Sequence, residues 1–290
     1  MARIVSNLSE ISESYDALFV DLWGCVHNGI KAFPDAIAAL RAYRKTGGAV
    51  VLVTNAPRGW HSVRKQLTRF ELPEDTWDAI ATSGDSARSA MFQGAVGEKV
   101  YFIGQPHDQS FFDRMELIKD PTTIAQVPLA DADGIVCCGP FDPMADPDVN
   151  RADFLVAKQK GMKLLCANPD IVVDRGETRE WCAGALAKLF TQMGGESLYF
   201  GNPHPPIYDL ARRRLAAAGF DVEPHRILAI GDGVLTDIRG AMGEDIDSLL
   251  ITGGLAAAET STKTAPNPEK LETYLQREEV NPTFAIGVLR

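Results

Sequence analysis

Short apolar runs that end at polar residues recur along the chain, separated by segments with helical spacing of apolar residues. Three such runs are Ala17–Val20 before Asp21, Ala49–Val53 before Thr54, and Arg226–Ile230, apolar from its second residue, before Gly231 and Asp232. Four or five consecutive apolar residues are too few for a helix, but they fit a strand buried on both faces, as in a parallel sheet. The pattern therefore predicts parallel strands whose carboxyl ends carry polar groups.

The amphipathic segments between these runs predict helices. In Pro34–Thr46, Ile37, Leu40 and Tyr43 recur at helical spacing, and a Gly-Gly pair ends the segment. Further helices are predicted at Pro57–Phe70, Ser86–Gln93, Ile207–Ala218, Asp237–Met242 and Lys270–Arg277, and further strands at Ala79–Thr82, Ser248–Thr252 and, on an edge, Thr283–Ile286. Strands that alternate with helices favour an α/β fold with a doubly wound parallel sheet and right-handed crossovers.

The pattern changes in the middle of the chain, where the segment 98–198 carries strands and helices of its own. Its strands are predicted at Lys99–Ile103, Gly134–Cys138 and Lys163–Cys166, and its helices at Asp108–Met115, Ala152–Lys160 and Cys182–Met193. A charged loop through Glu180 precedes the last of these helices. We therefore predict a second α/β module, 98–198, inserted between the two parts of the first domain, 1–97 and 199–290.

Charge and cysteine content narrow the classes of partner. The 290-residue chain has a formal net charge of −10 and a pI near 5.0, which argues against binding to nucleic acid or to an anionic membrane surface. No apolar run approaches the ~20 residues of a spanning helix, and no signal peptide is recognisable at the N-terminus. The five cysteines show no CxxC spacing, so we expect reduced thiols, no zinc site and a cytoplasmic location.

Polar residues from separate strands are expected to converge, because parallel strands place their carboxyl ends on one edge of a sheet. Asp21, Thr54 and Asp232 would meet there, and Asp237 follows five residues after Asp232. Crowded carboxylates without histidine or cysteine ligands indicate a Mg²⁺ site. The alternative is that each of these residues caps a helix or a turn.

Four motifs at these positions resemble those of the haloacid dehalogenase superfamily, in its class IIA branch of capped phosphatases. They are Asp21-Leu22-Trp23-Gly24, Val53-Thr54-Asn55, Gly231-Asp232 with Thr236-Asp237, and Asn168-Pro169-Asp170; Gly201-Asn202-Pro203 stands where the family has GKP. That branch includes N-acetylglucosamine-phosphate and pyridoxal-phosphate phosphatases. The resemblance implies a Rossmann-like core with an inserted α/β cap of the C2 type, and a small phosphorylated substrate such as a sugar phosphate. A homodimer is kept open as the assembly.

The resemblance also implies a role for each matching residue. Asp21 would attack phosphorus and form an aspartyl-phosphate, which water then hydrolyses. Mg²⁺ would be bound by Asp21, by the main-chain carbonyl of Trp23 and by Asp232, with Asp237 as a direct or water-mediated ligand. The phosphoryl oxygens would be held by Thr54 and Asn55 at a helix N-terminus, with Arg58 and Asn202 nearby.

Two departures from the family pattern leave three functions open. Trp23 replaces the aspartate that acts as general acid, and Asn202 replaces a charged lysine. His27 is a candidate substitute acid, with a structural role as the alternative. The first expectation is a Mg²⁺-dependent phosphohydrolase. The alternatives are a regulator that binds a phosphorylated metabolite without turning it over, and an enzyme that transfers the phosphoryl group to an acceptor other than water.

Overall fold

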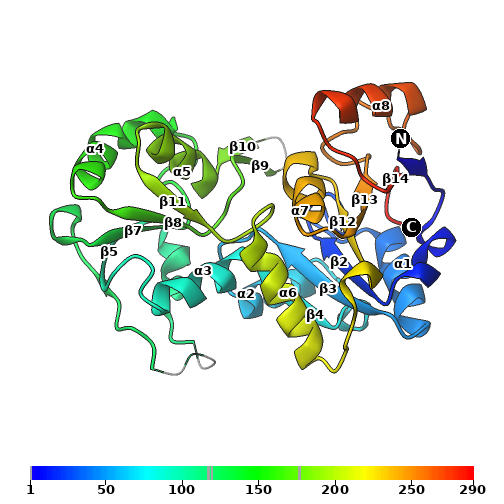
Figure 1. Ribbon diagram of the computed structural model, residues 1–290, viewed down its shortest axis with the longest axis horizontal. Coiled ribbons are helices and arrows are strands. Elements are labelled where there is room, and N and C mark those ends of the chain that lie inside the picture. The colour runs from blue at the N-terminus through cyan, green and yellow to red at the C-terminus, as the bar shows by residue number, and fades with distance from the viewer. Residues whose placement is uncertain (1, 116–117, 119, 176–177) are drawn as a thin grey trace. The chain divides into compact units, whose positions relative to one another are not determined.

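The computed structural model describes residues 2–115, 118, 120–175 and 178–290, and the chain folds into two compact units. Unit 1 comprises Met1–Thr54, Arg64–Ala81 and Asn202–Arg290, and unit 2 comprises Asn55–Val63 and Thr82–Gly201. Each unit is built on a sheet of its own with helices packed against it (Figure 1). The α/β fold class expected from the sequence is confirmed.

The sheet of unit 1 has seven strands in the order β1-β14-β13-β12-β2-β3-β4. Their bounds are β1 (Arg3–Ile4), β2 (Ala17–Asp21), β3 (Ala49–Thr54), β4 (Ala79–Thr82), β12 (Ile227–Gly231), β13 (Asp247–Ile251) and β14 (Phe284–Ile286). β2 lies between β12 and β3 and runs parallel to both. Its apolar residues Ala17–Val20 are at most 2% exposed, so the apolar run is a strand buried on both faces, as expected.

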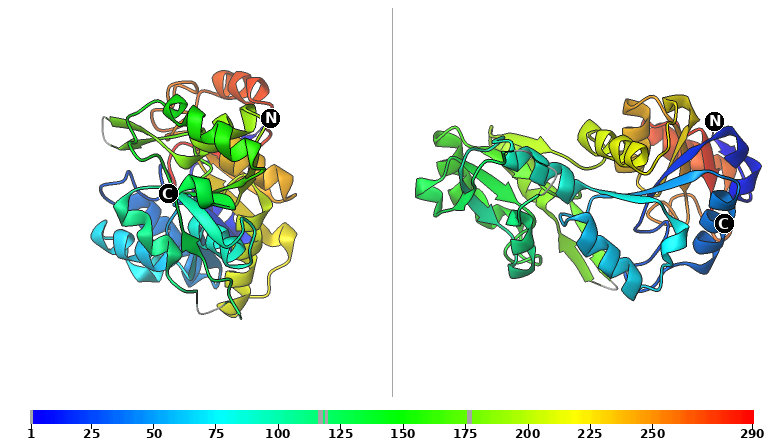
Figure 2. Two further views of the ribbon diagram at one scale, coloured as in Figure 1. Left: turned by 90° about the vertical axis from the view of Figure 1, so that its left-hand side faces the viewer. Right: turned by 90° about the horizontal axis from the view of Figure 1, so that it is seen from below.

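Helices enclose this sheet. α6 (Pro205–Ala217) and α7 (Arg239–Gly243) pack on one face of the sheet (Figure 2). Tyr208 and Ala241 from these helices join an apolar cluster with Phe19 and Val51. α1 (Pro34–Lys45) contacts β3, and α8 (Pro268–Arg277) packs against the strands β13 and β14. The remaining helix, α2 (Trp60–Arg69), begins in unit 2 and ends in unit 1.

Three expectations for these elements were wrong in detail. β14 is not an edge strand, because the two-residue strand β1 pairs with it on the outer side; so short a strand has no apolar pattern. α2 begins at Trp60 because the carboxylate of Asp85 accepts a hydrogen bond from the Trp60 N–H at 3.0 Å. The helix predicted at Asp237–Met242 is a π-helical turn, Val234–Ile238, followed by α7.

Unit 2 has a five-stranded parallel sheet in the order β11-β8-β7-β5-β6. Its strands are β5 (Lys99–Ile103), β6 (Ala125–Gln126), β7 (Gly134–Cys137), β8 (Lys163–Cys166) and β11 (Glu196–Tyr199), and its helices are α3 (Ser83–Phe92), α4 (Arg151–Gln159) and α5 (Ala183–Gln192). α4 and α5 contribute to the apolar cluster on one face of the sheet. α3 contributes to the cluster on the other face.

Unit 2 also departs from the expected elements. The charged loop predicted before α5 contains an antiparallel pair, β9 (Val172–Arg175) and β10 (Thr178–Trp181). The helix predicted at Asp108–Met115 is a 3₁₀ helix, Pro106–Phe112. α3 begins three residues earlier than expected because Thr82 caps it, its Oγ1 accepting from the Asp85 N–H at 2.9 Å.

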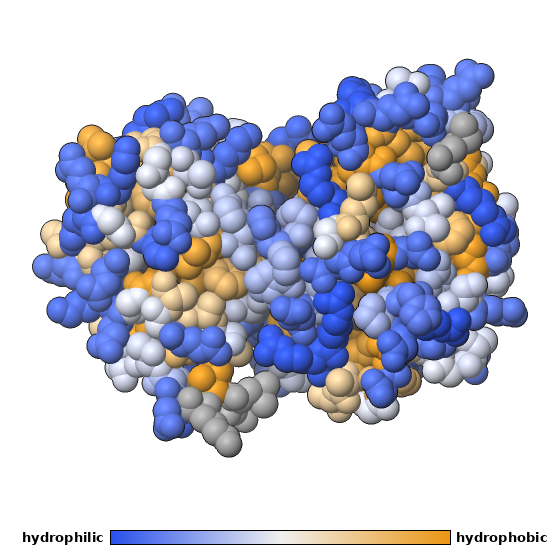
Figure 3. Space-filling view, in the orientation of Figure 1, coloured by the Kyte–Doolittle hydropathy of each residue, from blue (hydrophilic) through white to orange (hydrophobic). Residues whose placement is uncertain are grey.

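Among the described residues, no helix has the length and apolar character needed to cross a membrane. On the face shown in Figure 3, hydrophilic residues predominate and apolar residues form several separate patches. Exposed apolar side chains include Ile30 and Leu255 of unit 1 and Val149 of unit 2, each about 70% exposed.

The turn after β2 is built around a buried histidine. The His27 side chain is 3% exposed, and its Nδ1 accepts a hydrogen bond from the Gly29 N–H at 3.1 Å. The ring meets the rings of Trp23 and Phe70 edge-on at centroid distances of 5.5 and 4.9 Å. Burial lowers the pKa of His27 to about 4. The imidazole is therefore neutral at pH 7 and stabilises the turn.

We expect this histidine to make the protein sensitive to acid. The unfolded chain takes up a proton near pH 6.5 and the native state only near pH 4, so stability should fall as the pH drops through this range. A difference of about 2.5 in pKa corresponds to about 3 kcal/mol at most. Urea unfolding at several pH values should show this loss in wild type. His27→Asn keeps an acceptor for Gly29 but does not titrate, so its free energy of unfolding should decline less; parallel curves would refute the assignment.

Candidate active site

The polar strand ends expected to converge lie on neighbouring strands. Asp21, the last residue of β2, pairs with Val53, directly before Thr54 at the end of β3. On the other side of β2, Val20 pairs with Ile230, and Gly231 with Asp232 follows. Because the three strands are parallel, Asp21, Thr54 and Asp232 lie at the same edge of the sheet, as the sequence predicts.

Two glycines make room for the carboxylate of Asp232. A Cβ atom on Gly24 would lie 2.2 Å from Asp232 Oδ2, and one on Gly254 would lie 2.0 Å from the same oxygen. The main-chain N–H of Leu255 donates to Oδ2 at 3.0 Å. Asp232 is 5% exposed, so its carboxylate is fixed from two loops, one after β2 and one after β13.

Asp21, the candidate nucleophile, lies beside the carboxylate of Asp232. Ligand atoms of Asp21, Cys25 and Asp232 all lie within 4.8 Å of one another. Burial raises the pKa of the Cys25 thiol well above its usual value, and the charges of Asp232 and Asp21 raise it further. The thiol therefore stays protonated, and two carboxylates are the charged donors. Such an oxygen donor set fits Mg²⁺.

Asp237 accepts hydrogen bonds on both of its carboxylate oxygens. Its Oδ1 accepts from Asn202 Nδ2 at 2.7 Å, and its Oδ2 accepts from the Gly233 N–H at 3.0 Å. The side chains of Asn202 and Asp237 are both buried. A cavity of about 10 Å³ borders Asp21, Asn202 and Asp237. Asn202 therefore contacts Asp237 directly, and Asp237 is outside the group of close ligand atoms found among the described residues.

Trp23 is half-buried, and its indole packs within the turn that His27 organises. Gly29 has a φ of +83°, and a Cβ atom there would lie 2.4 Å from the indole ring. The indole therefore lies against the main chain of Gly29. An indole has no group that can transfer a proton to a leaving oxygen near neutral pH.

The segment after Thr54 belongs to unit 2. Asn55 is buried, and its Nδ2 donates to Asp170 Oδ1 at 2.8 Å. Arg58 is half-buried, and its main chain lies against Gly84, where a Cβ atom would come within 2.5 Å of Arg58 N. The first turn of α3 thus positions the residues that follow Thr54.

Sequence reasoning missed Cys25, the Gly254 contact and the bond between Asn55 and Asp170. A Gly-Gly pair at the end of β13 was a usable signal, because β13 is the neighbour of β12 and the pair therefore comes next to Asp232. No comparable signal marked Asp170 as the partner of a residue 115 positions earlier.

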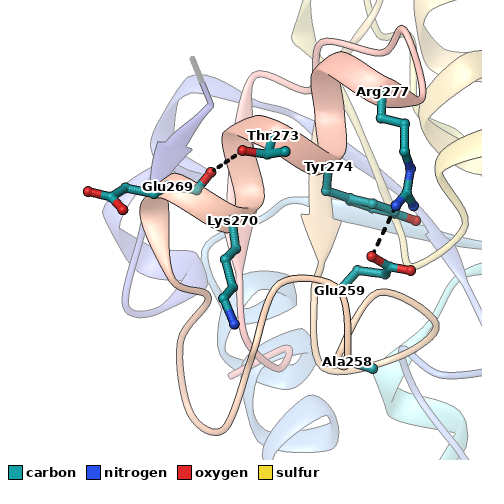
Figure 4. Close-up of a pocket in the computed structure, with 7 residues that line it drawn as sticks. All are labelled: Ala258, Glu259, Glu269, Lys270, Thr273, Tyr274 and Arg277. Atoms are coloured by element: carbon teal, nitrogen blue, oxygen red, sulfur yellow. Dashed lines mark hydrogen bonds and ion pairs between the residues drawn. The ribbon is translucent and has the colours of Figure 1, made fainter.

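A separate pocket of about 560 Å³ lies on unit 1 between α8 and the segment before it (Figure 4). Three of its charged groups make close contacts: Arg277 forms an ion pair with Glu259 at 3.1 Å, and Lys270 Nζ donates to Ser261 Oγ at 2.6 Å. None of the strand-end residues lines it. We therefore assign the chemistry to the edge of the sheet.

Comparisons with known proteins show which family of hydrolases the chain resembles. Residues 18–117 match the family described as haloacid dehalogenase-like hydrolase, and residues 199–276 match one described as HAD-hydrolase-like. The chain is 24% identical over 261 residues to the 5'-nucleotidase YutF of Bacillus subtilis (strain 168), covering 88% of this chain and 94% of that protein. A p-nitrophenyl phosphatase from Archaeoglobus fulgidus has a similar fold, with a TM-score of 0.70, 15% identity, and coverage of 94% and 96%.

A nearer structural relative settles the family. A haloacid dehalogenase-like hydrolase from Brucella suis 1330 is 35% identical, with a TM-score of 0.84, over 99% of this chain and 100% of the other. The chain therefore belongs to the haloacid dehalogenase-like hydrolase family.

Proposed function

We propose that this protein is a Mg²⁺-dependent phosphohydrolase that acts on a small phosphate monoester through an aspartyl-phosphate on Asp21. The observation that carries the proposal is the pair of carboxylates, Asp21 and Asp232, brought from separate strands to within 4.8 Å beside Cys25. Bound Mg²⁺ would neutralise phosphate charge that otherwise repels the attacking carboxylate. Asp21, Asp232 and the carbonyl of Trp23 would hold it, and Asp237 would act through water.

The reaction proceeds in two displacements at phosphorus. A carboxylate oxygen of Asp21 attacks phosphorus while the bond to the leaving oxygen breaks, and the leaving oxygen takes a proton to become an alcohol. Water then attacks the aspartyl-phosphate, releasing inorganic phosphate and restoring the carboxylate. Thr54, Asn55 and Arg58 would hold the phosphoryl oxygens, with Asn202 in support through Asp237.

The proposed substrate class is supported by the resemblance and by the relatives. A nucleotidase and a nitrophenyl phosphatase are among them, and we propose a small phosphorylated metabolite, of sugar-phosphate type, for this chain. The inserted module would act as the cap that selects it. A cytoplasmic location and homodimerisation stay predictions.

A second function is favoured by Trp23 and Asn202. Neither residue can supply a proton or a positive charge, so the site could bind a phosphorylated metabolite and regulate a partner without turnover. Hydrolysis of a panel of phosphorylated metabolites with Mg²⁺ and with EDTA separates the two functions: Mg²⁺-dependent turnover of any member supports the enzyme, and binding without turnover supports the regulator.

Mg²⁺ should stabilise the folded protein through Asp232. At a hundredfold excess over its dissociation constant, a ligand that binds only the native state adds about 2.7 kcal/mol. Melting curves with and without Mg²⁺ should show a rise in Tm for wild type and little change for Asp232→Asn. An equal rise in both proteins would remove Asp232 from the metal site.

Gly254→Ala should weaken Mg²⁺ binding without loss of the fold. The new Cβ would displace the Asp232 carboxylate, and crowding of this kind costs typically 1–3 kcal/mol. The matched control is Gly243→Ala in the same unit, where a Cβ atom meets nothing within 4 Å and φ is not positive. Titration of Mg²⁺ by calorimetry should show weaker binding for Gly254→Ala alone. Equal affinities in the two variants would contradict the steric account of Asp232.

Trp23→Asp should make the rate of hydrolysis depend less on whether the leaving oxygen needs a proton. Without a general acid, wild type should hydrolyse aryl phosphates, whose leaving oxygens need little protonation, far better than alkyl phosphates. A restored acid should raise the kcat for an alkyl phosphate about a hundredfold and the kcat for p-nitrophenyl phosphate much less. Asp21→Asn should abolish both activities. Loss of activity on Trp23→Asp in a protein that remains folded would show that tryptophan is part of a working site.

A further inference from the structure

The side chain of Asn55 is held by the carboxylate of Asp170, the last residue of the motif Asn168-Pro169-Asp170, to which the proposed function gives no role. Asn55 Nδ2 donates to Asp170 Oδ1 at 2.8 Å, and Asn55 is 9% exposed. We propose that Asp170 is a positioning residue for phosphate binding, which fixes Asn55 and with it the main chain directly after Thr54. This inference rests on the proposed function, in which Thr54 and Asn55 hold the phosphoryl group.

Asp170 is itself anchored through its main chain. Its N–H donates to Asn168 Oδ1 at 3.0 Å, and its carbonyl accepts from the Gly184 N–H at 3.1 Å. A Cβ atom on Gly184 would lie 2.0 Å from Pro169 O and 2.4 Å from Asp170 O. The loop therefore lies directly against the first turn of α5, and the position of the Asp170 carboxylate is set by a packed helix rather than by a free loop.

The amide of Asn55 is enclosed on a second side. A Cβ atom on Gly201 would lie 2.3 Å from Asn55 Oδ1 and 2.8 Å from both Pro169 Cδ and Ser83 Cβ. Asp170 thus meets the nitrogen of the amide while the main chain of Gly201 lies close to its oxygen. With both ends in contact, the amide has little freedom to rotate, and residue 55 is held in one orientation.

The residues after Asn55 are fixed by a different element. Ala56 O accepts a hydrogen bond from the Gly84 N–H at 3.0 Å, in the first turn of α3. This bond acts on the peptide group that follows Ala56, whereas the contact with Asp170 acts on the side chain of residue 55. The contact with Asp170 therefore has a separate effect, at the residue next to Thr54.

The charge of the Asp170 carboxylate strengthens its hydrogen bond with Asn55 near neutral pH. Burial raises the pKa of Asp170 to about 6, and the hydrogen bond from Asn55 acts in the opposite direction. At pH 7.5 the carboxylate is ionised, and an amide N–H donating to a carboxylate forms a stronger bond than one donating to a neutral acceptor.

Inorganic phosphate is the probe that tests this role. Its dissociation constant would be measured by calorimetry at pH 7.5 with Mg²⁺ on full-length wild type, Asn55→Ala, Asp170→Ala and the double variant. Loss of the bond should weaken phosphate binding roughly tenfold in each single variant. The double variant should be no weaker than either, because both changes remove the same bond. Asp170→Asn keeps an oxygen acceptor for Asn55, so its affinity should stay within about twofold of wild type.

Controls separate positioning from folding and from the proposed function. Asp148→Ala removes an exposed carboxylate of the same unit and should leave phosphate binding unchanged. If Asp170→Ala does not fold, Asp170→Glu, whose carboxylate is displaced by one methylene, takes its place. Wild-type phosphate affinity in the folded Asp170 variant, with or without a lower Tm, would overturn the inference, as would losses that multiply in the double variant. Wild type that binds phosphate but hydrolyses no monoester would overturn the proposed function alone.

Discussion

Repulsion between two carboxylates is the constraint on which the rest of unit 1 depends. Asp21 and Asp232 offer oxygens within 4.8 Å of each other, and two unit charges at that distance repel by about 3.5 kcal/mol at an effective dielectric constant of about 20. A flexible chain would relieve this by moving the groups apart. Here Asp21 ends β2 and Asp232 directly follows β12, its hydrogen-bonded parallel neighbour, so the sheet holds the charges together and favours a cation between them.

Close packing around Asp232 also explains why positions 24 and 254 are glycines. Asp232 lies so near two loops that Gly24 and Gly254 each have no room for a Cβ atom, and a main-chain N–H reaches its Oδ2. A carboxylate fixed by main-chain atoms loses little conformational freedom when a ligand binds. The position of the Asp232 carboxylate therefore depends on the main chain of the loops after β2 and β13.

The sequence predicted what depends on local pattern and missed what depends on contact between distant segments. Asp21, Thr54 and Asp232 could be placed because uninterrupted apolar runs mark buried parallel strands, and such strands fix where their ends lie. β14 was misplaced because its outer neighbour β1 is two residues long. The bond between Asn55 and Asp170 spans 115 residues, and no periodicity records it. The π-helical turn at Val234–Ile238 follows Gly233, whose N–H donates to Asp237 within that turn, a contact that helix propensity does not record.

The motif Val53-Thr54-Asn55 is divided between the two units. Thr54 ends a strand of unit 1, while Asn55 is the first residue of unit 2 and its side chain donates a hydrogen bond to Asp170 of that unit. The orientation of Thr54 is thus set by the seven-stranded sheet and that of Asn55 by Asp170 and Gly201. Because the two residues share a peptide bond, a change in the packing of unit 2 reaches the phosphate-binding segment through the chain itself. If unit 2 selects the substrate, as proposed, its residues can affect phosphate binding without touching phosphate.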